Sequence, residues 1–262
     1  MSKQVRLFVT FVCFFAVFQL KAQTINLTVE AIYPHQQAAL VYQPLADWLA
    51  QKTGFAVNIE SADNYYFYWR DAKTNNPDFT LDAPHIGAYR ITEKNYEPIL
   101  RIAADQKYYL VTNQNIDLTK DIGRQLVGQR VITFPSPNLG SLLYDRWFTD
   151  LFLQPQKVVT ALSWKDVINQ VFSGEAEAAI IPQYLYELYP NLLVLKESKP
   201  FPGQVFLASP TVSPSIKSSV IKALNEINES DEAYQILTEL NAEQLKPVDL
   251  KDYQGLEKLL GK

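Results

Sequence analysis

The sequence is poor in the residues that most enzymes use for covalent or metal chemistry. It has one cysteine, Cys13, which lies in an apolar run near the start of the chain. Loss of that run would leave no thiol, which excludes disulfides and cysteine catalysis. The only two histidines, His35 and His85, are far apart and have no pattern of carboxylates beside them, so a metal site is not expected. The chain also has no Gly-x-Ser-x-Gly motif. We therefore expect neither a cofactor nor an enzyme.

Positive charge is also scarce. The chain has 24 Lys and Arg against 28 Asp and Glu, for a net charge of −4. Residues 1–22 contain three cations (Lys3, Arg6 and Lys21) and no acid, so their removal lowers the net charge from −4 to −7. An acidic surface repels nucleic acids and anionic lipids, so we expect neither as a partner.

The first 22 residues have the pattern of a secretory signal peptide. Lys3 and Arg6 precede an uncharged, mostly apolar run, 7–20, which ends at Lys21-Ala22. A membrane-spanning helix needs roughly 20 apolar residues, so this run is short for that role. The favoured cleavage site follows Ala22, although Leu20 is bulky for the third position before a cut. An uncleaved anchor is the alternative, and either pattern places the folded chain outside the cytoplasm.

From Ile25 onward, short runs typical of strands alternate with amphipathic stretches typical of helices, which indicates an α/β fold with a mostly parallel sheet. Repeats and low-complexity linkers are missing. Strands are expected at 25–33, 56–60, 79–83, 97–104, 107–113, 130–134, 158–162, 176–181, 192–197 and 204–208. Helices are expected after Pro34 up to Gly54, and at 64–73, 84–93, 118–126, 139–152, 163–172, 215–228 and 231–241.

These elements form two blocks of similar size, which predicts two lobes. The first lobe is expected to contain 23–113 together with 203–262, and the second lobe 114–202. Small ligands commonly bind in clefts between domains, so the ligand site is expected between the lobes.

The order of the segments resembles the PhnD-like family, the periplasmic phosphate, phosphite and phosphonate substrate-binding proteins of ABC importers. The resemblance implies a type II Venus-flytrap fold, with two α/β lobes that close on a ligand by two hinge strands, here 108–112 and 205–208. It also implies an ABC permease as partner. A monomer is expected. The segments that carry it are 42–54, Asp63-Asn64-Tyr65, Arg130-Val131-Ile132-Thr133-Phe134-Pro135-Ser136 up to Gly140, 174–179, and Phe201-Pro202-Gly203-Gln204 up to Ser213-Pro214.

The loop 135–141 joins a strand to a helix, where backbone N–H groups and the helix dipole favour an anion. The resemblance implies hydroxyl groups here that hold phosphonate oxygens, and the candidate ligand-binding residues of this loop are Ser136, Asn138 and Ser141. The sequence departs from the family because Pro137 removes an N–H donor and because Asn138 and Leu139 replace hydroxyl residues. A dianion would be held less well as a result. Alternatively, Ser136 or Asn138 only caps the helix.

Three more ligand candidates follow from the resemblance, and each differs from the family residue. Asp82 stands near an aromatic or small position, Trp164 where histidine is common, and Gln204 where aspartate is common. Asp82 could face a ligand amine or cap the helix that begins at Pro84. Trp164 falls on the apolar face of its helix and could equally be a core residue.

The aromatic run 65–69 and His85 complete the candidate site. Only one side of a helix can be buried, so some of these rings could contact a ligand, and Tyr65 lies next to the family's tyrosine position. His85 follows the third strand and is expected either in the cleft or in a capping role.

Two other functions remain possible on the sequence alone. The same chain could present its ligand to a membrane receptor instead of a permease. Similar folds also host enzymes, although the missing thiol, metal cluster and Ser–His pair argue against one here.

Overall fold

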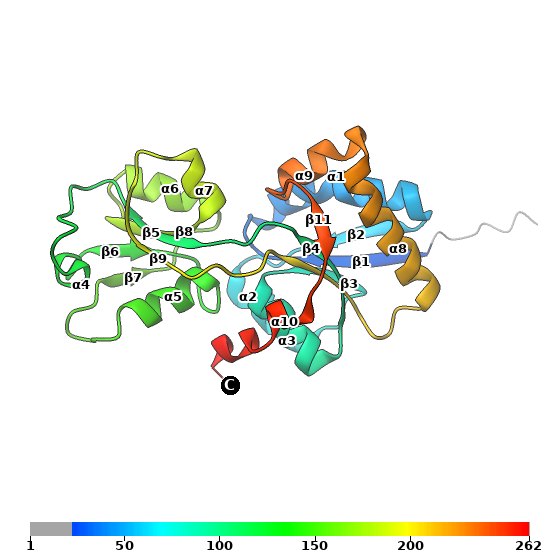
Figure 1. The fold of residues 1–262 in the computed structure, drawn as a ribbon, viewed down its shortest axis with the longest axis horizontal. Coiled ribbons are helices and arrows are strands. Elements are labelled where there is room, and N and C mark those ends of the chain that lie inside the picture. The colour runs from blue at the N-terminus through cyan, green and yellow to red at the C-terminus, as the bar shows by residue number, and fades with distance from the viewer. Residues whose placement is uncertain (1–22, 262) are drawn as a thin grey trace, which may run out of the picture.

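The computed structural model describes residues 23–261, so the expected signal peptide lies outside the described residues. Figure 1 shows two lobes side by side, each built around its own sheet. The first sheet has the order β11-β4-β10-β3-β1-β2. Its strands are β1 (Thr24–Val29), β2 (Ala56–Glu60), β3 (Phe79–Asp82), β4 (Glu97–Ile102), β10 (Val205–Ala208) and β11 (Leu245–Pro247).

The second sheet has the order β7-β6-β8-β5-β9. Parallel pairs stand beside antiparallel ones in both sheets: β1 runs parallel to β2 and β3, whereas β10 runs antiparallel to β3 and β4. The strands of the second sheet are β5 (Tyr108–Thr112), β6 (Arg130–Ile132), β7 (Gln156–Val158), β8 (Ala178–Pro182) and β9 (Leu193–Glu197).

Helices cover both sheets. Those of the first lobe are α1 (His35–Thr53), α2 (Tyr65–Thr74), α3 (Pro84–Lys94), α8 (Pro214–Glu226), α9 (Tyr234–Glu239) and α10 (Leu250–Tyr253), with short 3-10 turns η1 (Ile227–Glu229), η2 (Asp231–Ala233) and η3 (Leu256–Leu260). Those of the second lobe are α4 (Ile122–Gln125), α5 (Leu139–Trp147), α6 (Trp164–Phe172) and α7 (Gln183–Leu188). No helix within residues 23–261 is long and apolar enough to cross a membrane.

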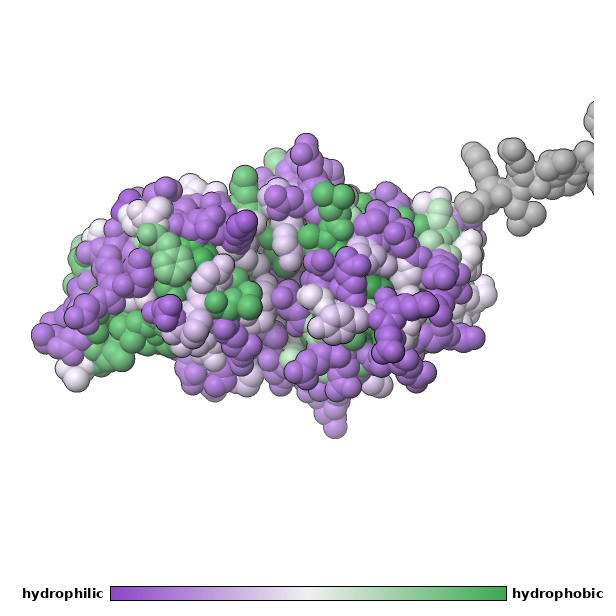
Figure 2. All heavy atoms as spheres, turned by 90° about the horizontal axis from the view of Figure 1, so that it is seen from above, coloured by the Kyte–Doolittle hydropathy of each residue, from purple (hydrophilic) through white to green (hydrophobic). Residues whose placement is uncertain are grey.

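Each lobe has its own hydrophobic core. In the first lobe Leu27, Leu81 and Phe206 from the sheet pack with Trp48 from α1, whose indole N–H donates to the carbonyl of Ala223 at 2.8 Å. A second cluster fills the other lobe around β5, β6 and β8. The face in Figure 2 is mostly hydrophilic, as expected when apolar side chains are used inside two separate cores.

The chain crosses between the lobes twice, at 103–107 and 198–204, and the expected hinge positions were wrong. Strand β5 pairs only within the second sheet and β10 only within the first, so neither strand is a connection. For the same reason, the boundary expected at residue 113 placed β5 in the first lobe, whereas β5 belongs to the sheet of the second lobe. The crossings run antiparallel and are joined by Gln106 and Phe201, whose backbone N–H groups donate to each other's carbonyls at 2.7 and 2.9 Å.

Three expected elements of the second lobe are shorter or displaced. The helix expected at 118–126 is one turn, α4, because Asp117 accepts the N–H of Thr119 in a turn and Asp121 caps the helix by accepting the N–H of Arg124, so the helix begins only at Ile122. The helix expected at 139–152 ends at Trp147, and Phe148 has left the helical conformation. The strand expected at 158–162 is β7, which ends at Val158.

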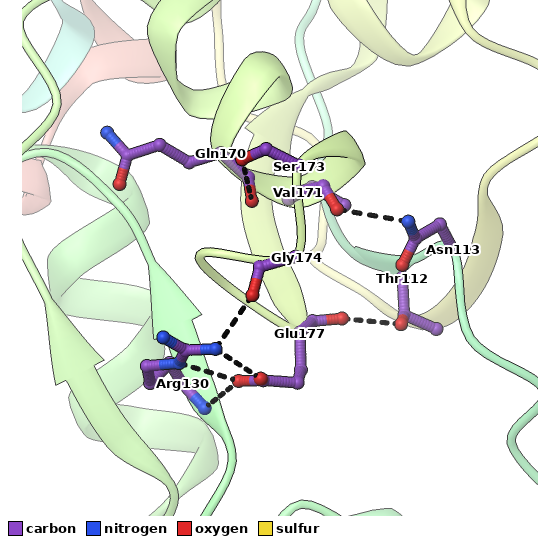
Figure 3. Close-up of polar contacts among 8 residues, drawn as sticks. All are labelled: Thr112, Asn113, Arg130, Gln170, Val171, Ser173, Gly174 and Glu177. Atoms are coloured by element: carbon purple, nitrogen blue, oxygen red, sulfur yellow. Dashed lines mark hydrogen bonds and ion pairs between the residues drawn. The ribbon is translucent and has the colours of Figure 1, made fainter.

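An ion pair ties the turn after α6 to the start of β6 (Figure 3). Arg130 lies 2.6 Å from Glu177, and its Nη2 also donates to the carbonyl of Gly174 at 2.8 Å. The hydroxyl of Thr112 donates to the carbonyl of Glu177 at 2.6 Å. The guanidinium of Arg130 lowers the pKa of Glu177 by hydrogen bonding to its carboxylate. These contacts fix the start of β6, and the loop 135–141 follows the other end of the same strand. The cluster therefore has a structural role.

Candidate functional site

A cavity of about 50 Å3 lies between the two lobes. One water needs roughly 10–15 Å3 of such space, so this lobe arrangement leaves room for only a few waters. The lining comes from both lobes and both crossings: Glu30, Ile32, Tyr42, Ala83, Pro84, Ile102, Gln106, Tyr108, Leu139, Trp164, Pro182, Tyr184, Phe201, Pro202, Gln204, Glu239, Leu240 and Asn241.

Glu30 is the buried acid of this cavity. It follows β1, at the carboxyl end of the parallel strands, where ligands of open α/β sheets bind. Its Oε1 accepts a hydrogen bond from the hydroxyl of Tyr65 at 2.9 Å, and its Oε2 accepts one from Nε2 of Gln204 at 2.5 Å. Burial raises the pKa of Glu30 to about 7, and these hydrogen bonds oppose that rise only in part. A small change in its surroundings can therefore change its charge near neutral pH.

The residues at the start of α5 form the second part of the site. Asn138 caps the helix by accepting the N–H of Gly140 at 2.9 Å, as the capping alternative expected. Three buried polar atoms here have no hydrogen-bond partner within residues 23–261: Thr133 Oγ1, Asn138 Nδ2 and Ser141 Oγ. A Cβ on Gly140 would lie 2.3 Å from Thr133 Oγ1, so only glycine allows this close approach.

His85 connects the two parts. The side chain projects from the start of α3 in the first lobe, and its Nε2–H donates to the carbonyl of Pro137 in the second lobe at 2.7 Å. Burial lowers the pKa of His85 to about 4, so the ring is neutral at pH 7. Its buried Nδ1 then carries a free lone pair and has no partner in the described part of the chain.

The eight residues singled out from the sequence lie in different places. Trp164 and Gln204 line the cavity, and Trp164 also packs edge-on against Phe134 at 4.5 Å between ring centroids. Asn138, Ser141 and His85 lie at the start of α5 or against it. Tyr65 is fully buried and touches the cavity only through Glu30. Ser136 is exposed at the surface.

Asp82 is held inside the first lobe and does not line the cavity. Its Oδ2 lies 2.9 Å from Nε of Arg90 and accepts the hydroxyl of Thr80 at 2.6 Å, while Oδ1 accepts the hydroxyl of Tyr68 at 2.5 Å. Both carboxylate oxygens of Asp82 are hydrogen bonded and Arg90 is its counter-ion, so Asp82 stabilises the first lobe in this structure.

Sequence reasoning missed Glu30, Thr133 and four of the five aromatic residues of the cavity wall. Glu30 fell inside the strand expected at 25–33, whereas β1 ends at Val29 and Glu30 follows it at the edge of the parallel sheet where ligands bind. Thr133 was assigned to a strand, and its hydroxyl was not considered. The missed aromatic residues are Tyr42, Tyr108, Tyr184 and Phe201.

Residues 27–253 match the family model for the periplasmic substrate-binding protein of phosphonate ABC transporters. The chain belongs to this family. The phosphonate-binding family consists of transport proteins and not of enzymes, and its members work with a permease on a small-molecule ligand. No curated protein sequence matches the chain.

Solved structures show that the fold is the type II Venus flytrap expected for the phosphonate-binding family. PhnD1 from Prochlorococcus marinus in complex with methylphosphonate is 14% identical with a TM-score of 0.74, over 90% of this chain and 97% of that one. A binding protein component of a phosphonate ABC transporter from Pseudomonas aeruginosa is 14% identical with a TM-score of 0.75, over 91% and 85%. An arginine-binding protein from Salmonella typhimurium is 12% identical with a TM-score of 0.55, over 83% and 98%.

Proposed function

We propose that this protein closes its lobes outside the cytoplasmic membrane on a small ligand with a phosphonate-like head and delivers it to an ABC permease. Residues 1–22 act as a signal peptide that is removed on export, and the mature chain works as a monomer. Family membership supports the transport role, and the match to the family does not favour the sensory alternative.

The observation that carries the proposal is the set of three buried polar atoms without partners at the start of α5. Native proteins leave very few buried polar atoms without a hydrogen bond. Asn138 and Ser141 place such atoms at the first turn of α5, at the positive end of the helix dipole, and Thr133 Oγ1 lies beside Gly140 of that turn. An oxyanion head of the ligand supplies the missing partners.

The surroundings of this helix end favour a head with a single negative charge. Pro137 offers no N–H, and His85 is neutral at pH 7 because burial lowers its pKa to about 4. A singly protonated phosphonate has oxygens that accept from Asn138 and the hydroxyls, and a P–O–H group that can donate to Nδ1 of His85.

Ligand entry requires the lobes to open. The cavity of about 50 Å3 is enclosed by residues from both lobes, and the bond between His85 and Pro137 spans them. Rotation about the two crossings would separate these groups and expose the start of α5 to solvent, which is the hinge movement of two-lobed binding proteins.

A melting experiment on the mature chain, residues 23–262, tests the proposal. The panel contains methylphosphonate, ethylphosphonate, phosphite, phosphate and sulfate. A ligand at about 100 times its Kd stabilises the folded state by about 2.7 kcal/mol, which raises the melting temperature of a chain of this size by about 5–10 °C. Isothermal titration calorimetry then gives the stoichiometry, which we expect to be one.

The Ser141→Ala variant shows whether a shift arises at the start of α5. A phosphonate-induced shift that disappears in this variant supports the site. The absence of a shift with every phosphorus oxyanion would contradict the proposed ligand class, and an equal shift in both proteins would contradict its placement.

A further inference from the structure

The C-terminal segment, residues 249–261, is attached to the hinge between the lobes. It begins with α10, which follows β11 at the edge of the first sheet. Tyr253 on α10 is buried, and its hydroxyl donates to the carbonyl of Gly203 at 2.7 Å. Gly203 lies in the second crossing, so the segment is hydrogen bonded directly to one of the two connections.

Arg101 connects the same segment to the first crossing. Its side chain is buried, Nη1 lies 2.9 Å from Asp105 in the first crossing, and Nη2 lies 3.4 Å from Asp252 on α10. A guanidinium is planar and presents its donors in fixed directions, so it orients the groups that it pairs with. One side chain thereby joins the end of β4, the first crossing and the C-terminal segment.

The two crossings are in close contact at the point that Tyr253 reaches. A Cβ on Gly203 would lie 2.3 Å from the carbonyl oxygen of Ile102 and 2.8 Å from that of Ala104, so only glycine allows this approach. Ala104 belongs to the first crossing. A rotation about the crossings therefore acts on the groups that hold α10.

After α10 the chain continues as η3, which lies against α3 and reaches the second lobe. Figure 1 shows the C-terminal end turning from α10 toward the second lobe. Leu256 packs against the buried cluster around Tyr253, and Leu260 against the cluster around Tyr65, both in the first lobe. Leu259 packs instead against the hydrophobic cluster of the second lobe. The leucines of one short turn thus contact both lobes.

We propose that the C-terminal segment is a latch that positions the two lobes: α10 holds the segment to the hinge, and Leu259 holds the second lobe against it in the closed form. Opening of the lobes separates Leu259 from the second-lobe cluster and exposes apolar surface, which costs free energy. The latch therefore raises the closed fraction of the empty protein and lowers the apparent Kd of a ligand that binds the closed form. The inference rests on the proposed function only in the hinge movement, and not in the chemistry of the ligand.

Distances between the lobes in the absence of ligand test the latch. Residues 23–262 contain no cysteine, so Lys73→Cys on α2 and Arg146→Cys on α5 introduce the only two thiols, one in each lobe and both at exposed positions. Spin labels on these thiols, measured by double electron–electron resonance, give the distribution of lobe separations. Leu259→Ala is made in this background. Leu250→Ala, which shortens an exposed leucine of the same segment, is the matched control.

We expect Leu259→Ala to shift the distribution toward the open form and to lower the ratio of closed to open molecules about 3- to 10-fold, the factor for losing part of a half-buried leucine side chain. Leu250→Ala should keep the wild-type distribution, and deletion of residues 259–262 should reproduce the shift. The Kd of methylphosphonate, measured by isothermal titration calorimetry, should rise in Leu259→Ala by the same factor as the ratio falls.

The outcomes separate the latch from the proposed ligand. An unchanged distribution of lobe separations in folded Leu259→Ala overturns the latch and leaves the phosphonate function in place. An equal shift in Leu250→Ala overturns it as well, because the effect would not come from contact with the second lobe. A Leu259→Ala protein that circular dichroism shows to be unfolded would mean that Leu259 serves the fold, which also overturns the latch. A shifted distribution without any binding of methylphosphonate supports the latch and contradicts the proposed ligand class.

Discussion

Nε2 of His85 lies 2.7 Å from the carbonyl oxygen of Pro137, so a side chain of the first lobe hydrogen bonds to the backbone of the second. A carbonyl only accepts, so Nε2 carries the proton, and the neutral ring presents Nδ1 as an acceptor. One residue thereby helps to hold the lobes together and offers an acceptor beside the start of α5.

Replacement of His85 by Phe should weaken ligand binding about 10-fold or more, because the closed form loses one hydrogen bond between the lobes and the proposed phosphonate loses the acceptor Nδ1, while the ring volume is kept. Small-angle X-ray scattering should show a larger radius of gyration for the variant without ligand. Unchanged scattering together with unchanged affinity would mean that this bond does not contribute to closure.

Replacement of Ser141 by Ala should lower phosphonate affinity about 10-fold or more and leave the melting temperature of the empty protein unchanged or higher. Its buried Oγ has no partner in the described part of the chain, so the fold loses no bond when the hydroxyl is removed, whereas a bound oxyanion loses a donor. Ser218→Ala on α8, an exposed position, is the matched control. A large drop in melting temperature would show that the hydroxyl serves the fold.

Relative to Glu30→Gln, the stability of the empty wild type should fall as pH rises from about 5 to 8, whereas the lowered pKa of His85 adds stability to both proteins over the lower part of this range. The folded state raises the pKa of Glu30 from 4.5 to about 7, so it retains a proton that the unfolded chain releases. The shift corresponds to about 3 kcal/mol lost across this range. Melting curves of Glu30→Gln should lack this component and give a higher melting temperature than the wild type at pH 8. Identical pH profiles would rule out Glu30 as the titrating group.

Replacement of Asp82 by Asn should destabilise the protein by about 3–5 kcal/mol, because Arg90 would remain buried without its counter-ion. Urea unfolding measures the change. Glu177→Gln, which breaks the partly exposed pair with Arg130, should cost much less. If Asp82→Asn unfolded like the wild type but bound ligand weakly, Asp82 would belong to the ligand site after all.

Most of the fold could be predicted from the sequence because its signals are local. The expected strand at 56–60 matches β2, and Pro84 begins α3 as expected. Strand β11 was missed because Leu245-Lys246-Pro247 is too short to show a pattern and forms only by pairing with β4. The hinges were misplaced because apolar runs reveal strands but not the sheet that each strand joins.

The site was harder to predict because its chemistry depends on contacts between distant segments. Asp82 looked like an available acid, since nothing in the sequence pairs it with Arg90 or Tyr68. Tyr65 looked like a ligand contact, and its hydroxyl is engaged by Glu30, which is 35 positions away. Trp164 combines both roles that were considered, since it packs against Phe134 and also lines the cavity.

The two crossings between the lobes are hydrogen bonded to each other and form one hinge. Gln106 and Phe201 exchange backbone hydrogen bonds, so the two connections bend as one ribbon, and both residues also belong to the cavity wall. A ligand in the cavity would therefore contact the two connections about which the lobes rotate.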